Sequence, residues 1–123
     1  MNSEILRQFV AKYVETRYQE RLLYEFGSDR KRANALSRFS HDAEAVLKKS
    51  VSKTILTKTE DVQEKDQSVH VISWDEKDGK TLALCEALRY FEASYMSVIL
   101  IGKDFALIKE ETEKGSAKIL YLR

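Results

Sequence analysis

The chain has no proline, a single cysteine and four glycines among its 123 residues. Because proline is absent, nothing in the sequence forces a kink, and helices are expected to run without interruption. The one cysteine, Cys85, permits no intramolecular disulfide, which fits a reducing compartment. We therefore expect the hydrophobic core to stabilise the fold without intramolecular disulfide bonds.

The sequence also lacks a long apolar run and a strong net charge. The longest apolar stretch, around residues 96–101, is far too short to span a bilayer, and the segment that begins with Met1 and contains Glu4 does not have the pattern of a secretory signal. The net charge is +1, with a mildly basic first half and a mildly acidic second half. We therefore expect one soluble, cytoplasmic domain over residues 1–123 that does not act on a membrane.

The apolar residues in 1–50 recur with the periodicity of α-helices. Apolar side chains recur on one side of residues 4–26, and Gly27 marks the expected end of this helix. Ser28 is expected to cap a second helix that runs to about Lys49. Two helices joined around one Gly-Ser pair are expected to pack as an antiparallel hairpin.

Residues 51–123 have the pattern of a sheet with one further helix. Strands are expected at 51–57, 68–74, 96–102, 105–111 and 117–123, a helix at 81–93, and an exposed loop at 58–67. The fold class is thus α+β, in the order α-α-β-β-α-β-β-β, with a C-terminal three-strand meander in a mostly antiparallel sheet. Strand 96–102 is apolar on both faces and should be central, whereas Lys118 and Arg123 suggest that 117–123 is an edge.

The charged segment DEKDGK, residues 75–80, allows two structural interpretations. An Asp-Gly pair between apolar patterns is typical of a hairpin, which would make 80–85 a strand. The alternative is a loop before a helix, with Asp78 as its cap and Gly79 at positive φ. The stripe that begins at Leu84 fits the helix better and would place Cys85 in the core.

The same segment raises the question of a metal site. Its acids are hard oxygen ligands, but EF-hand spacing is absent. Asp75 and Lys77, with Asp61 or Asp66 upstream, loosely resemble the pattern in which metal-dependent nucleases hold Mg²⁺ and steer a water. Turn chemistry explains every residue without a ligand, so no metal and no cofactor is predicted, and a small metal-dependent nuclease remains the least favoured alternative.

The second helix carries a basic face opposite its core stripe. Its members are Arg30, Lys31, Arg38, His41, Lys48 and Lys49. Such a face can bind nucleic-acid phosphates or an acidic partner. Asp42 and Glu44 interrupt it and no aromatic residues are interleaved, so nucleic-acid binding is the second-ranked function.

The first helix has an interrupted apolar stripe. Arg17 and Glu20 fall on the side that carries Tyr13 and Tyr24. Three explanations stay open: a buried polar network with the tyrosine hydroxyls, a helix that overhangs its sheet, or a surface for a partner.

Tyrosine, arginine and tryptophan dominate interface hot spots, so the candidate interface residues are Arg17, Tyr18, Arg21 and Trp74. The sequence carries no catalytic signature that we can identify, and it favours a non-catalytic role. The leading hypothesis is an interaction or regulatory module that binds another protein. Self-association is also compatible with this pattern.

Overall fold

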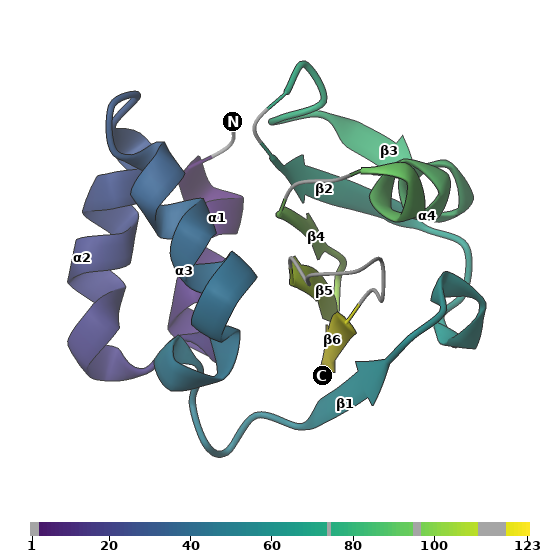
Figure 1. The fold of residues 1–123 in the computed structure, drawn as a ribbon, viewed down its shortest axis with the longest axis horizontal. Coiled ribbons are helices and arrows are strands. Elements are labelled where there is room, and N and C mark those ends of the chain that lie inside the picture. Colours follow the sequence, from purple (N-terminus) through teal and green to yellow (C-terminus); the bar gives the residue numbers. More distant parts are fainter. Residues whose placement is uncertain (1–2, 74, 95–96, 111–117) are drawn as a thin grey trace.

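A computed structural model describes residues 3–73, 75–94, 97–110 and 118–123, with the side chains of residues 3 and 40–42 left out. Within these ranges, six antiparallel strands form one sheet in the order β1-β6-β5-β4-β2-β3. Helices α1–α3 lie on one face of this sheet and α4 lies on the other (Figure 1). The predicted α+β class and the order of its elements are confirmed.

The element bounds are as follows. The helices are α1 (Ser3–Tyr13), α2 (Thr16–Gly27), α3 (Arg32–Val46) and α4 (Leu84–Ala93), with a short 3₁₀ helix η1 (Thr59–Asp61). The strands are β1 (Lys53–Leu56), β2 (Ser68–Ile72), β3 (Thr81–Ala83), β4 (Val98–Ile101), β5 (Ala106–Glu110) and β6 (Lys118–Leu122). The predicted turn around Gly115 lies outside the described residues.

The first predicted helix, residues 4–26, is divided between α1 and α2. At the junction the Glu15 amide donates to the Val46 carbonyl at 2.9 Å, and the Lys48 amide donates to the Tyr13 carbonyl at 2.8 Å. Backbone groups from the end of α3 thus pair with the α1–α2 junction, in place of continued helical bonds. The chain breaks the helix without proline, contrary to our expectation.

The predicted cap of the second helix also has a different role. The Ser28 amide donates to the Glu25 carbonyl at the end of α2, and Lys31 occupies the N-cap position of α3. The Ser28 carbonyl accepts from the amides of Lys31 and Arg32, both at 3.0 Å. A short turn therefore separates the two helices.

Two apolar layers cover the two faces of the sheet. In β4, Ile99 and Ile101 pack toward α1–α3, whereas Val98 and Leu100 pack toward α4. All four are buried, and β4 has a strand on each side, so its predicted internal position is confirmed.

Strand β6 was predicted to be an edge, and this prediction is wrong. Strand β1 pairs alongside it, so β6 lies between β1 and β5. The charged residues at the two ends of β6 form ion pairs and do not protect a sheet edge. Lys118 binds Glu110 at 3.4 Å, and Arg123 binds Glu64 at 2.9 Å. Glu64 belongs to the predicted loop 58–67, which these contacts hold against β6.

The 75–80 segment combines both structural interpretations. It closes a hairpin between β2 and the short strand β3, and α4 begins directly afterwards. Gly79 has a φ of 80° and its amide donates to the Val71 carbonyl, as a tight turn requires. Asp78 does not cap α4, because Ala83 holds that position.

The prediction that Cys85 lies in the core is wrong, since its side chain is exposed. The buried stripe of α4 consists of Leu84, Ala87 and Phe91. Cys85 follows Leu84 directly, and one residue turns the helix by about 100°, away from that stripe.

Candidate interaction surface

Helix α2 is the outermost element of the helical layer (Figure 1). Its far side carries three exposed large side chains. The side chains of Arg17 and Arg21 are 71% and 66% exposed, and Tyr24 is 63% exposed. Positions separated by four and then three residues fall on one helical face. We call Arg17, Arg21 and Tyr24 the α2 stripe.

The α2 stripe corrects part of the sequence interpretation. Tyr24 was placed on the buried side of the first helix, but the buried residues of α2 are Leu22, Glu25 and Phe26. The sequence interpretation counted residues 4–26 along one continuous helix. The break before Thr16 changes the direction in which every later side chain points. The spacing between Arg17 and Tyr24 in the sequence was the signal that would have identified Tyr24 as part of this exposed face.

Cation–aromatic contacts order the side chains around this stripe. The guanidinium of Arg17 lies 4.8 Å from the centre of the Tyr18 ring, and its Nε lies 3.2 Å from Glu15. The Lys31 ammonium lies 5.3 Å from the centre of the Tyr24 ring. Each contact contributes about 0.5–1 kcal/mol at an exposed site, enough to bias side-chain conformation.

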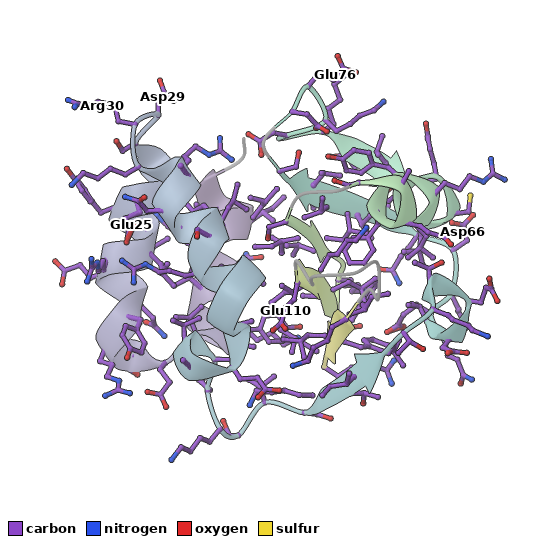
Figure 2. All side chains as sticks on the ribbon, viewed as in Figure 1. Glu25, Asp29, Arg30, Asp66, Glu76 and Glu110 are labelled. Carbon is purple, nitrogen blue, oxygen red and sulfur yellow. The ribbon has the colours of Figure 1, made fainter. Side chains whose placement is uncertain are left out.

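A buried carboxylate joins α2 to α3. Glu25 is 4% exposed, and its Oε1 forms ion pairs with Arg21 Nε and Arg38 Nη2, each at 3.2 Å (Figure 2). Arg38 Nε lies 3.3 Å from the same oxygen. A buried charge is costly unless it is paired, so these two arginines offset the cost of placing the Glu25 carboxylate between the helices. Arg17 and Glu20 are both exposed, so of the three explanations for the interrupted stripe a buried polar network does not fit these two residues.

The predicted basic face of the second helix is dispersed. Arg38 is half-buried against Glu25, and Lys48 Nζ donates to the Ala11 carbonyl at 2.6 Å. Arg30, Lys31 and Lys49 are exposed, and Arg30 points outward from the α2–α3 turn beside Asp29 (Figure 2). The side chain of His41 and all of Trp74 lie outside the described residues.

The acidic segment between β2 and β3 is a hydrogen-bonded turn. The carboxylate of Asp75 accepts from the Tyr90 hydroxyl at 2.8 Å, the Lys77 amide at 2.9 Å and the Ser73 hydroxyl at 3.0 Å. These donors come from the turn itself and from α4. Glu76 points away from the turn (Figure 2).

The pKa values of this cluster follow from its contacts. Burial alone would raise the pKa of Asp75, but hydrogen bonds from Lys77, Tyr90 and Ser73 together bring it below 3.8. Burial raises the pKa of Tyr90 from 10.0 to about 12, and the Asp75 carboxylate adds to this shift while the Ser73 hydroxyl opposes it. Asp75 is thus held as an ionised acceptor and Tyr90 as a neutral donor.

Asp78 connects the turn to the helical layer. Arg32 Nη1 lies 2.6 Å from Asp78 Oδ2, and Arg32 Nη2 lies 2.7 Å from Oδ1. The Ser73 amide also donates to Oδ1 at 3.0 Å. The predicted helix cap is therefore an ion pair between the start of α3 and the β2–β3 turn.

Within the described residues, no three His, Cys, Asp or Glu side chains are grouped so that they could hold a metal ion. No helix in this part combines the length and apolar character that crossing a membrane requires. Comparison with protein-family models, curated proteins and solved structures finds no match for this chain.

Proposed function

We propose that this chain is a cytoplasmic, non-catalytic interaction module that binds another protein through the outer face of α2. The observation that carries the proposal is the α2 stripe, which presents the Tyr24 ring and two arginines on the outer face of the outermost helix. Tyrosine and arginine anchor interfaces because they bury a large area and still donate hydrogen bonds. The expected partner offers an apolar recess for the Tyr24 ring and acceptors for the guanidinium groups.

The charge balance around this stripe supports a protein partner over a nucleic acid. Over residues 15–31, acidic and basic residues occur in equal number. Arg17 is paired with Glu15, and Arg21 with Glu25. A phosphate backbone is gripped by an excess of cations, whereas protein interfaces tolerate mixed charge at their rim.

The test compares the wild-type chain with Tyr24→Ala and Arg17→Ala as baits in the native host, followed by affinity measurement with the purified partner. Tyr24→Ala is expected to weaken binding by about 30-fold or more, as for a central hot spot. Ile55→Ala is the matched control, because Ile55 is also large, apolar and exposed but lies on β1. An equal loss of partner affinity in Ile55→Ala would contradict the proposal.

Two other outcomes would overturn it. The first is retention of nucleic acid that weakens steeply with salt and with Lys31→Glu and Lys49→Glu, but not with Tyr24→Ala. The second is metal-dependent cleavage of DNA or RNA that Asp75→Ala and Lys77→Ala abolish, which would restore the nuclease alternative.

A further inference from the structure

Helix α1 and the sheet line a half-open cavity of about 300 Å³. One wall is α1, and the other is formed by β2, the end of β4 and the turn that follows β4. This volume is at the small end of the range for ligand pockets. The cavity shares no residue with the α2 stripe.

The inner part of the cavity is apolar. Phe9, Tyr13 and Ile101 are buried, and Ile5 is half-buried beside them. The rings of Phe9 and Tyr13 lie 5.5 Å apart with a tilt of 52°, which fixes their orientation through packing. This part suits an aromatic or aliphatic group of a small molecule.

The polar part of the lining is cationic. Lys12 comes from α1, Lys103 from the turn after β4, and His70 from β2, with Gln8 and Ser68 beside them. Among the described lining residues there is no carboxylate. The positive charges therefore lack a counter-charge within the cavity wall, which favours an anionic group there.

Local contacts order the Lys12 side chain and the turn that carries Lys103. The Lys12 ammonium lies 5.1 Å from the centre of the Tyr13 ring. The Lys103 amide donates to Gln67 Oε1 at 3.3 Å, which ties the turn to the segment before β2. The turn needs Gly102, because a Cβ there would lie 2.1 Å from the Phe105 ring.

His70 adds a ring nitrogen that can donate to a ligand. Its Nδ1 lies 3.0 Å from the Thr81 hydroxyl on β3, so Nε2 is the ring nitrogen left for a ligand. When the hydroxyl donates to Nδ1, the neutral imidazole carries its proton on Nε2 and donates from that atom.

We propose that this half-open cavity binds a small organic carboxylate, with its apolar body against Ile5 and the edges of the buried Phe9 and Tyr13 rings, and its carboxylate between Lys12 and Lys103. An inorganic anion would leave the apolar part unused, and a neutral ligand would leave the lysines without a counter-charge. The inference is independent of the α2 stripe and would survive the failure of the proposed function.

The test follows amide chemical shifts by NMR while phenylbutyrate, phenylbutanol or inorganic phosphate is added to the intact chain. Phenylbutyrate is expected to bind with a Kd below about 1 mM and to shift the amides of residues 5–13, 68–70 and 101–103. Lys12→Met and Lys103→Met should each weaken it by about tenfold, as for a lost charge-assisted hydrogen bond. Both lysines are exposed, so these variants are expected to fold.

The controls separate this site from general attraction of anions. Lys49→Met removes an exposed lysine elsewhere and should leave the Kd unchanged. Equal binding of phenylbutyrate and phenylbutanol, or equal losses in the Lys12 and Lys49 variants, would overturn the inference. It would also be overturned if phosphate bound through the same lysines while phenylbutyrate caused no shift.

Discussion

Removing the contact between Arg32 and Asp78 is expected to loosen the helical layer from the β2–β3 turn. The two side chains are only 21% and 19% exposed, and a hydrogen bond of 2.7 Å and a second ion-pair contact of 2.6 Å join them. A bidentate pair of this kind is stronger than a neutral hydrogen bond and is weakly screened by salt. Asp78→Asn keeps an acceptor for the Ser73 amide but leaves the guanidinium without its counter-charge.

The expected magnitude follows from this partial burial. Loss of hydrogen bonds to charged groups costs about 1.5–3 kcal/mol, so Asp78→Asn and Arg32→Gln should each lower the free energy of unfolding by about 2 kcal/mol. The double variant should cost about as much as either single variant, which gives a coupling energy of about 1.5–2 kcal/mol. Urea unfolding followed by far-ultraviolet circular dichroism measures all four proteins.

The pair formed by Arg17 and Glu15 provides the internal control. It has one contact of 3.2 Å, and the arginine is 71% exposed. A mutant cycle on this pair should give a coupling of about 0.5 kcal/mol or less. The reasoning is refuted if the coupling between Arg32 and Asp78 is no larger than in the control pair.

Two further contacts give separate predictions. Lys109→Met removes an ammonium that donates to three carbonyls at the end of α4, and it should cost about 2 kcal/mol in urea unfolding, whereas the exposed Lys80→Met should stay within about 0.5 kcal/mol. If Lys109→Met lowered the free energy of unfolding no more than Lys80→Met does, this stabilising role of Lys109 would be contradicted. The Tyr90 phenol should titrate near pH 12, seen as the absorbance difference from Tyr90→Phe, and Asp75→Asn should move it toward 10.0. Since its folded pKa is raised, the stabilisation by Tyr90 is complete below pH 10.0 and is lost as pH rises through about 12; a midpoint near 10.0 in the folded chain would contradict it. For Asp75, whose folded pKa is lowered, the contribution is present above pH 3.8 and is lost as pH falls through the folded value.

The candidate sites were only partly predictable from the sequence. Arg17 and Arg21 were expected at an interface and are exposed on α2, and Tyr18 is half-buried beside them. Tyr24 was missed because its position was counted along one continuous helix. The cavity was not predicted at all, because its wall joins residues 5–13, 68–70 and 101–103, and no local pattern connects segments so far apart.

What the sequence determined by itself was the local alternation of buried and exposed positions. Val69 and Val71 lie on one face of β2 and Ile72 on the other, as the period of two requires. The stripe of α4 and the positive φ of Gly79 were likewise readable from residue types alone. Such features depend on one element's contact with the core or on one residue's backbone, and they therefore appear in a short window.

Only the tertiary structure decided which distant groups became partners. The break at Glu15 arises because the end of α3 offers a carbonyl to its amide, and Asp78 becomes an anchor because Arg32 lies across from the turn. Strand β6 became internal because β1 pairs alongside it. Each outcome depends on a hydrogen-bonding group brought close by packing of the whole chain, and buried polar groups bind whichever partner the packing supplies.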